Sequence, residues 1–448
     1  MKFEGKNVGI VGLGKSGYWA SKLAKNLYYN VFVSDTNSNI DTSMIDDLEN
    51  LGVETELGKH TNKILNSDII IKSPGISNDI EILKKIKESG IPVISEIEFA
   101  GMISNVKNIC ITGTNGKTTT VSLIDQILKE DLNVLKSGNI GIPFSQIVLE
   151  HRLYDKNDID YCILELSSFQ LEHCSHLKKE ISAFINISND HLDRYESFND
   201  YFNTKLKIFE NSKYCFFNNE DKILKEKIKN DNIDKEPFST QEDKGNFFFE
   251  NNKIFSNDRS ISINIDEISI KGIHNISNIM IAAEIAHKVG IKKENIFKAI
   301  KNFKGLEHRF EFLKSFNSID YINDSKSTNV DSTVKALKSI TKKVVLILGG
   351  IPKENDFNEI LLYKSKILKI VVYGEAKDMI YDSLSQEVEV LKIHSFDDAV
   401  HIAIKNAIKD SVVLLSPGCA SFDQFNNYEE RGIKYKNIIE RFYAWILR

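Results

Sequence analysis

Asn108-Ile-Cys-Ile-Thr-Gly-Thr-Asn-Gly-Lys-Thr-Thr-Thr-Val121 is the stretch from which the rest of the chain can be interpreted. An apolar run typical of a strand breaks into a glycine loop, and apolar residues at helical spacing follow. This is the layout of a phosphate-binding loop, in which backbone N–H groups and a helix N-terminus hold phosphate oxygens. We expect Lys117 to reach the outer phosphates and the Thr118 hydroxyl to bind Mg²⁺.

The loop is a shortened variant of the usual pattern. A glycine is expected five residues before Gly116, and Ile111 occupies that position. An ordinary strand-to-helix turn is the alternative interpretation. Gly-Lys-Thr-Thr directly after a strand favours phosphate binding.

Length and composition indicate a soluble chain of two to four domains. The 448 residues are 42% hydrophobic and 27% charged, and the formal net charge of −5 provides no basic field for nucleic acid. Apolar runs are strand-sized, so membrane insertion is not expected, and the first residues lack the apolar core of a signal peptide. Five cysteines without a C-x-x-C pair favour a reducing compartment, and we expect a cytoplasmic protein.

The amino-terminal part contains a second glycine loop. Gly12-Leu-Gly-Lys-Ser-Gly17 follows a predicted strand, and Asp35 ends the next strand, as in a dinucleotide fingerprint. Taken alone, this pattern predicts an NAD-dependent dehydrogenase or a nucleotide-sensing module. It establishes only that a pyrophosphate-bearing nucleotide fits there.

The remaining chain continues as α/β units. Glu165 ends the apolar strand 161–165 beside the phosphate loop, which is the usual arrangement for holding Mg²⁺. Residues 212–270 are rich in Lys, Asn and Asp, and we interpret them as an insert-like region. The pattern resets near residue 305 into further strands and helices, which predict another open α/β sheet.

Five stretches of the chain share a recognisable pattern. They are Gly113-Thr-Asn-Gly-Lys-Thr-Thr119, Glu165-Leu-Ser-Ser-Phe-Gln170, His191-Leu-Asp-Arg-Tyr195, Asn323-Asp-Ser-Lys-Ser-Thr-Asn329 and Ser416-Pro-Gly-Cys-Ala-Ser-Phe-Asp-Gln-Phe425. Together they resemble the D-glutamate-adding members of the Mur ligase family, over essentially the whole chain. The phosphate loop alone indicates only the wider Mur and folylpolyglutamate ligase group.

The resemblance implies a three-domain α/β fold. A Rossmann-like UDP-binding domain would span residues 1–96, a central P-loop ATPase-type domain with a mostly parallel sheet residues 97–304, and a Rossmann-like amino-acid-binding domain residues 305–448. It also implies a monomer that uses ATP to join D-glutamate to UDP-N-acetylmuramoyl-L-alanine through an acyl phosphate, in peptidoglycan synthesis. The alternative is another amide ligase of the group with a different amino acid or acceptor.

The resemblance assigns the nucleotide and metal residues. Lys117, His191, Lys205 and Lys326 would be catalytic. Thr118 and Glu165 would hold one Mg²⁺, while His191 and a carbamylated Lys205 would hold a second. ATP would be bound by Gly113, Thr114, Asn115, Gly116, Lys117, Thr118, Thr119, Asn275, Asn278, Arg309 and Asp324.

The other two substrates are assigned in the same way. The UDP-substrate would be bound by Gly14, Lys15, Ser16, Asp35, Thr36, Gly75 and Ile76, with Asn139 and Gln170 facing its muramoyl part. D-glutamate would be bound by Thr328, Lys353, Ser421 and Tyr428. Asn37 occupies a position where the family often carries a basic residue, and this difference affects the contacts expected between this loop and the uracil of the UDP-substrate.

Structural roles are open alternatives for several of these residues. A lysine such as Lys205 on a Lys-rich helix is usually solvated, and His191 could satisfy a turn. Asp324 and Arg309 could form a structural ion pair. Ser421 and Thr328 could cap loops.

Overall fold

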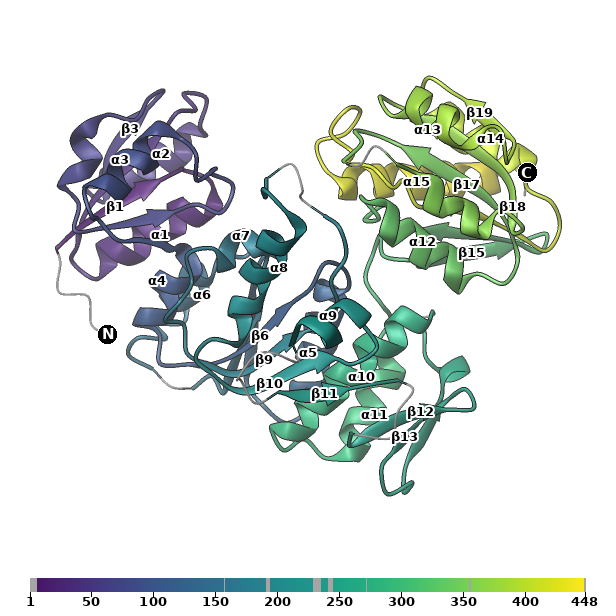
Figure 1. Cartoon of the computed structure of the whole chain (residues 1–448), viewed down its shortest axis with the longest axis horizontal. Helices are drawn as coiled ribbons and strands as arrows, with labels where there is room; N and C mark the ends of the chain where they lie inside the picture. Colours follow the sequence, from purple (N-terminus) through teal and green to yellow (C-terminus); the bar gives the residue numbers. More distant parts are fainter. Residues whose placement is uncertain are drawn as a thin grey trace.

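Three α/β lobes follow one another along the chain in the computed structural model, which describes residues 6–156, 158–190, 194–228, 235–240, 245–270, 272–353 and 356–446. The first lobe (purple in Figure 1) and the last lobe (yellow-green) flank the middle lobe. Each is built around its own sheet of five or six strands. The expected three-part α/β architecture is confirmed.

The first sheet is entirely parallel, in the order β3-β2-β1-β4-β5. Its glycine turn is tightly packed, because a Cβ on Gly17 would lie 2.0 Å from the carbonyl oxygen of Gly12. The elements are β1 (Asn7–Val11), α1 (Lys15–Asn26), β2 (Asn30–Asp35), α2 (Thr42–Asn50), β3 (Glu54–Leu57), η1 (Asn62–Asn66), β4 (Ile69–Lys72), α3 (Glu81–Glu88) and β5 (Val93–Ser95).

The middle sheet is also parallel, in the order β11-β10-β9-β6-β8-β7. Helix α5, which follows the phosphate loop, lies on it through a fully buried face that matches the predicted apolar face, Val121, Leu123, Ile124, Ile127 and Leu128. The elements are α4 (Glu96–Ile103), β6 (Lys107–Thr112), α5 (Lys117–Leu128), β7 (Val134–Gly138), α6 (Phe144–Glu150), β8 (Tyr161–Glu165), α7 (Ser168–Leu171), β9 (Lys179–Phe184), α8 (Phe198–Leu206), η2 (Lys207–Phe209), β10 (Ser212–Asn218), α9 (Lys222–Ile228), β11 (Glu236–Phe238), α10 (Ile273–Lys288) and α11 (Lys293–Asn302).

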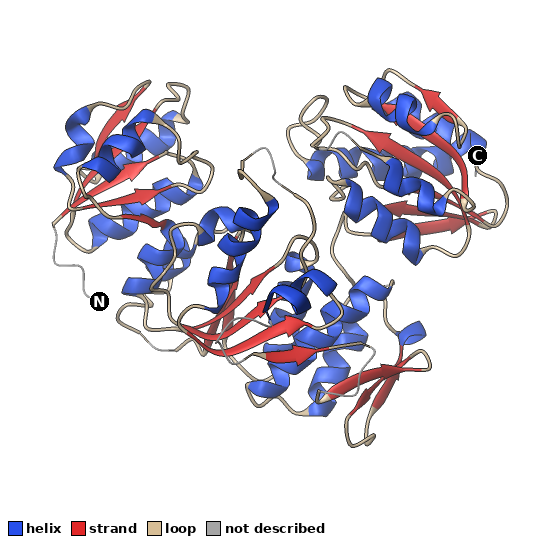
Figure 2. Cartoon of the chain, viewed as in Figure 1, coloured by secondary structure: helices blue, strands red, loops and turns tan. Residues whose placement is uncertain are grey.

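Residues 212–270 are only partly an insertion. β10 and β11 extend the middle sheet, because β10 pairs in parallel with β9 and β11 pairs in parallel with β10. Phe216 and Phe238 of these strands are buried in the core. The small antiparallel sheet of β12 (Phe247–Glu250), β13 (Lys253–Ser256) and β14 (Ser262–Asn264), with η3 (Ile265–Glu267), lies apart from it at the lower right of Figure 2.

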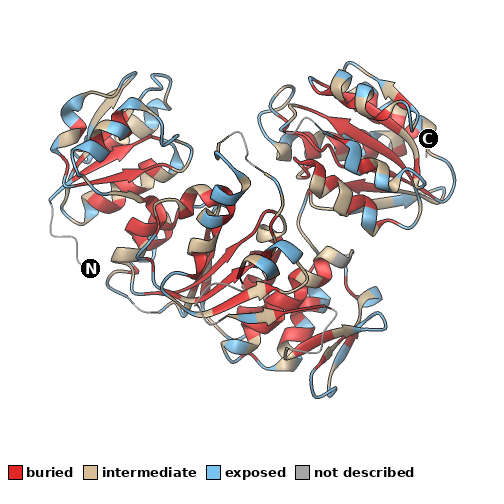
Figure 3. Cartoon of the chain, in the orientation of Figure 1, coloured by how far each residue is buried: buried red, intermediate tan, exposed pale blue. Residues whose placement is uncertain are grey.

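The third sheet has the order β15-β16-β20-β17-β18-β19, with antiparallel β15 at its edge and parallel neighbours otherwise. The strands of the large sheets are mostly buried, as expected where helices cover both faces (Figure 3). The elements are β15 (Glu311–Phe316), β16 (Ile319–Asn323), α12 (Val330–Ser339), β17 (Lys343–Gly349), η4 (Asn358–Tyr363), β18 (Ile367–Tyr373), α13 (Lys377–Leu384), β19 (Val390–Lys392), α14 (Phe396–Asn406), β20 (Ser411–Leu415) and α15 (Tyr428–Ile446).

Helix α4 begins at the predicted limit between the first two domains and packs against both α1 and α6. The limits at residues 96 and 304 therefore stay an interpretation, which we keep for naming the domains. Within the described ranges, no helix combines the length and the apolar character needed to cross a bilayer.

Candidate active site

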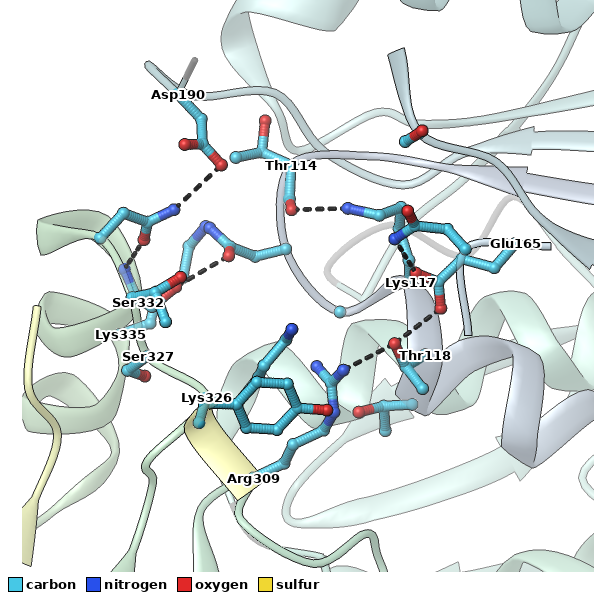
Figure 4. A pocket seen from close by; sticks show the side chains of 18 of the residues that line it. Thr114, Lys117, Thr118, Glu165, Asp190, Arg309, Lys326, Ser327, Ser332 and Lys335 are labelled. Atoms are coloured by element: carbon cyan, nitrogen blue, oxygen red, sulfur yellow. Dashed lines mark hydrogen bonds between the residues drawn. The ribbon is translucent and has the colours of Figure 1, made fainter. Parts of the chain in front are cut away.

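A cavity of about 570 Å³ lies between the second and third domains. The loop of residues 113–119, called the phosphate loop below, forms one wall, and residues that follow β16 form the opposite wall (Figure 4). The predicted site residues that line this cavity are Thr114, Asn115, Gly116, Lys117, Thr118, Thr119, Asn139, Glu165, Lys205, Asn275, Asn278, Arg309, Asp324, Lys326, Thr328, Lys353 and Tyr428.

The phosphate loop has the backbone that its sequence predicts. Gly116 has a φ of +82°, and a Cβ there would lie 2.7 Å from the Asn278 side chain, so only glycine fits without strain. Lys117 begins α5, and its ammonium donates to the carbonyl oxygens of Gly113 and Thr114 at 2.8 and 2.9 Å. Burial lowers the pKa of Lys117, while the Glu165 carboxylate opposes the shift. The Lys117 side chain therefore folds back onto the phosphate loop that precedes it.

Thr118 joins the phosphate loop to two other elements. Its hydroxyl donates to the Glu165 carboxylate at 2.6 Å and accepts from the Arg309 guanidinium at 2.7 Å. Asn139 donates to the other Glu165 oxygen at 2.9 Å. A hydroxyl and a buried carboxylate that converge in this way are hard oxygen donors, so the residues fit a divalent cation such as Mg²⁺.

Lys205 is buried rather than solvated. Its ammonium donates to the Gly113 carbonyl at 2.9 Å and lies 5.0 Å from the centre of the Tyr201 ring. Burial lowers the pKa of Lys205 well below its usual range, and the nearby Lys117 ammonium adds to the effect. Among the described residues Lys205 has no carboxylate as a hydrogen-bond partner, and a buried lysine held against the phosphate loop fits a role in the site better than the solvated alternative.

Polar side chains gather where α10 begins and where β16 ends. Asn278 accepts from the Thr120 hydroxyl at 3.3 Å and donates to Asn275 at 3.2 Å. Asp324 accepts from the Ser327 and Ser416 hydroxyls at 2.5 and 2.9 Å, and burial raises its pKa to about 6. These contacts show that Asp324 also holds together the loops of its own domain.

Lys326 projects toward the phosphate loop from the third domain, as Figure 4 shows. Its ammonium lies 3.8 Å from the centre of the Tyr428 ring, a cation–π contact. Burial lowers the pKa of Lys326 to about 7, and the nearby Arg309 guanidinium adds to the shift. Lys353 lines the same cavity and lies 3.7 Å from the Asp190 carboxylate.

Comparison with known proteins identifies the family. Three domain models match successive parts of the chain: the MurD N-terminal domain over residues 7–82, the Mur ligase middle domain over 111–286 and the Mur ligase glutamate ligase domain over 308–419. A UDP-N-acetylmuramoylalanine–D-glutamate ligase from Bacteroides thetaiotaomicron is 41% identical, over 97% of this chain and 99% of that protein. The chain belongs to the Mur ligase family. A ligase of the same name from Elusimicrobium minutum is 38% identical to this Mur ligase over 98% of both chains.

Solved structures with the same fold are also Mur ligases. The UDP-N-acetylmuramate-alanine ligase MurC from Thermotoga maritima has a TM-score of 0.60 at 19% identity, covering 98% of this chain and 99% of that one. MurF ligase from Thermotoga maritima, in complex with ADP, has a TM-score of 0.61 at 14% identity, covering 92% and 95% of the two chains. At these identities the likeness supports the fold alone.

In this Mur ligase, the residues predicted for the UDP-substrate lie mainly in the first domain, at the ends of its strands. Gly14 precedes α1, Lys15 and Ser16 begin it, and Lys15 lines a smaller cavity of about 350 Å³ with Trp19. The Asp35 carboxylate accepts from the backbone N–H of Leu13 at 2.6 Å and of Asn37 at 2.7 Å, so it joins the glycine turn to the end of β2. Thr36 follows it in the chain.

The loop that holds Gly75 and Ile76 contacts the second domain. Arg194 donates to the carbonyl oxygens of Pro74, Gly75 and Ile76 at 2.9, 3.3 and 2.8 Å. Its guanidinium also lies 4.0 Å from the centre of the Phe169 ring. Arg194 belongs to the motif of residues 191–195, but its sequence context predicted no role for it.

Three of the predicted residues make contacts within the protein that their assigned roles did not include. Asn139 binds Glu165 and so lies at the phosphate site. The Gln170 side chain accepts from the backbone N–H of Ser167 at 3.0 Å within a capping box. Ser421 is buried, accepts backbone hydrogen bonds in a turn, and is absent from the lining of the large cavity. His191 lies outside the described residues.

Two acidic residues near the cavity were not predicted from the sequence as site residues. Asp190 accepts from Asn329 at 3.3 Å, and Asp331 accepts from Asn115 at 2.6 Å, both across the domain boundary. Asp190 stands directly before His191, which was the available signal. Asp331 had no signal, because an acid in the first turn of a helix is ordinary.

Replacing Lys117 by alanine should reduce turnover about 100- to 1000-fold, because the change removes a cation that faces developing phosphate charge. The fold should survive, since this side chain lines the cavity. Steady-state ADP release and thermal unfolding measure the two effects. Lys129→Ala, at the other end of α5, is the control and should keep normal turnover. A Lys117→Ala enzyme with most of its activity would contradict the assignment.

Proposed function

We propose that this Mur ligase uses ATP to join D-glutamate to UDP-N-acetylmuramoyl-L-alanine, forming an amide, ADP and phosphate in peptidoglycan synthesis. The observation that carries the proposal is the identity of 35–41%, over nearly the whole chain, to proteins named UDP-N-acetylmuramoylalanine–D-glutamate ligase. The cavity supports it, because a phosphate loop there faces lysines of another domain. We also propose a cytoplasmic enzyme that acts as a monomer.

The reaction proceeds in two steps. A carboxylate oxygen of the L-alanine residue attacks the γ-phosphorus of ATP, and the bond to the β-phosphate oxygen breaks to release ADP. The neutral amine of D-glutamate then attacks the acyl carbon, phosphate leaves, and the new amide nitrogen loses a proton. Lys117, Arg309 and Lys326 would offset the negative charge that gathers in both steps.

We assign the metal ions to two sets of residues. Thr118 and Glu165 would hold one Mg²⁺, and His191 with a carbamylated Lys205 would hold a second. When bound, Mg²⁺ would neutralise phosphate oxygens and favour transfer of the γ-phosphoryl group. The buried amine of Lys205, with its lowered pKa, supports carbamylation, which requires a neutral amine.

The nucleotide and substrate assignments complete the proposal. Asn275, Asn278, Arg309 and Asp324 would surround the adenine, ribose and phosphates of ATP. Thr328, Lys353, Ser421 and Tyr428 would bind D-glutamate. The UDP-substrate would lie along the first domain, held by Gly14, Lys15, Ser16, Asp35, Thr36, Gly75 and Ile76, with Asn139 and Gln170 toward its muramoyl part.

The function is tested by ADP release from the purified enzyme with ATP, Mg²⁺ and UDP-N-acetylmuramoyl-L-alanine, with and without D-glutamate. We expect rapid release only when all are present, and no comparable release when other amino acids replace D-glutamate. Release with another amino acid would instead support another amide ligase. A change in NADH absorbance would support the dehydrogenase alternative.

Lys353→Ala should raise the KM for D-glutamate about tenfold or more, because a charge-assisted bond to a substrate carboxylate contributes about 1.5–3 kcal/mol. The KM for ATP should change much less. Lys364→Ala, an exposed lysine of the same domain paired with Glu387, is the control. Equal increases for both substrates would place Lys353 elsewhere in the site.

Lys205→Ala should be nearly inactive, because the carbamate needed to bind the second Mg²⁺ cannot form. A small carboxylate in solution, such as formate, should restore part of the activity by supplying hard oxygen ligands. The electron density of a crystal grown with bicarbonate should show three additional non-hydrogen atoms on the Lys205 amine. Full activity of Lys205→Ala would rule the role out.

A further inference from the structure

The first turn of α12 reaches across the domain boundary to the phosphate loop. Asp331, its second residue, accepts from the Asn115 amide at 2.6 Å and from the Ser188 hydroxyl at 2.7 Å, both in the second domain. Lys335, on the next turn of the same helix, donates to Asp331 at 2.6 Å. Figure 4 shows Ser332 and Lys335 on the side of the cavity opposite Thr114.

Both ends of the Asn115 amide are bound by this turn. Its nitrogen donates to Asp331, and its oxygen accepts from the Ser332 hydroxyl at 2.7 Å. The backbone N–H of Asn115 is separately held by Asn186 at 2.9 Å. The amide group of Asn115 therefore has both its donor and its acceptor satisfied by α12 of the third domain. Because both bonds must form together, they fix one docking position of α12.

An acid in the first turn also favours its own helix through the helix dipole, whether or not the domains are docked. That ordinary role does not account for the contacts of Asp331. Asn329 already caps α12 by accepting from the backbone N–H of Ser332. Among the described residues, two of the three hydrogen bonds that the Asp331 carboxylate accepts come from the second domain, and these form only when α12 is docked.

We propose that Asp331 is a positioning residue that latches the third domain onto the phosphate loop. The latch, defined as Asp331 with Asn115 and Ser188, holds the segment that carries Lys326 and Thr328, only a few residues before α12, over the phosphates. Asp331 does not line the cavity, so it acts through that segment and not on a substrate. The contribution of Asp331 to catalysis rests on the proposed function, whereas its contribution to domain docking is independent of that function.

The latch stabilises one arrangement of the two domains selectively. Hydrogen bonds to a carboxylate are among the stronger ones in proteins, and these are absent when the domains separate. Their loss shifts the equilibrium toward separated domains in proportion to their contribution. Lys335 compensates the charge of Asp331 beside a site that receives phosphates, so the acid does not repel the nucleotide.

Docking is measured by energy transfer between dyes on the second and third domains. Glu294→Cys and Asp382→Cys provide two exposed attachment sites, while the five native cysteines are buried. Asp331→Ala should lower the ratio of docked to separated molecules about tenfold, in the free enzyme and with a non-hydrolysable ATP analogue. Ser188→Ala should lower it less, and adding it to Asp331→Ala should cause little further loss, because both bonds share one carboxylate.

Asp397→Ala is the matched control. Asp397 is also the second residue of a helix, α14, and also pairs with a lysine, Lys434, but within the third domain. It should leave the docking ratio unchanged, with thermal unfolding confirming that both variants fold. A docking ratio for Asp331→Ala equal to that of Asp397→Ala would overturn the latch.

Kinetics separate positioning from simple loss of structure. Asp331→Ala should lower kcat/KM for D-glutamate about tenfold, with little change in the KM for the UDP-substrate, and Asp331→Asn should recover part of the loss because it keeps an acceptor oxygen. Equal changes in the kinetic constants for D-glutamate and for the UDP-substrate would argue against a positioning role. Failure of Asp331→Asn to recover activity would also argue against it. If the wild-type enzyme forms no amide but the docking ratios behave as expected, the proposed function fails and the latch stands.

Discussion

One hydroxyl joins three parts of this Mur ligase. Thr118 belongs to the phosphate loop, donates to the carboxylate that ends β8, and accepts from an arginine of the third domain. Its position follows from the glycine before α5, since the left-handed backbone of Gly116 sets the direction in which the helix begins. The first turn of α5 therefore connects the middle sheet, the phosphate loop and the third domain.

The site gathers lysine side chains from two domains around one cavity. Lys117, Lys205 and Lys326 all have lowered pKa values, each caused first by burial. Because burial disfavours the charged form of a lysine, keeping these groups protonated costs folding free energy. Anionic substrates recover that cost when they bind, so the same arrangement that weakens the free protein strengthens its complexes.

Much of the fold was predictable because local patterns agree with the tertiary structure. The apolar run before the phosphate loop and the acid that ends β8 lie where the sequence predicted them, since parallel strands bring their carboxyl ends to one edge. Gln170 was predicted to face a substrate, although the spacing of Ser167 and Gln170 is itself a capping-box pattern. The cross-domain contacts of Asp331 and Arg194 were not predictable, because Asn115 and Pro74, which they bind, lie more than a hundred residues away in the chain.

The division of the cavity between two domains also bears on how such enzymes diverge. The phosphate loop and Glu165 belong to one lobe, whereas Lys326, Thr328 and Lys353 belong to another. Under the proposed assignment of D-glutamate to the third lobe, a change in which amino acid is accepted can accumulate there while the lobe that carries the phosphate loop stays intact. The three-lobed fold itself is shared with a MurC and a MurF at below 20% identity.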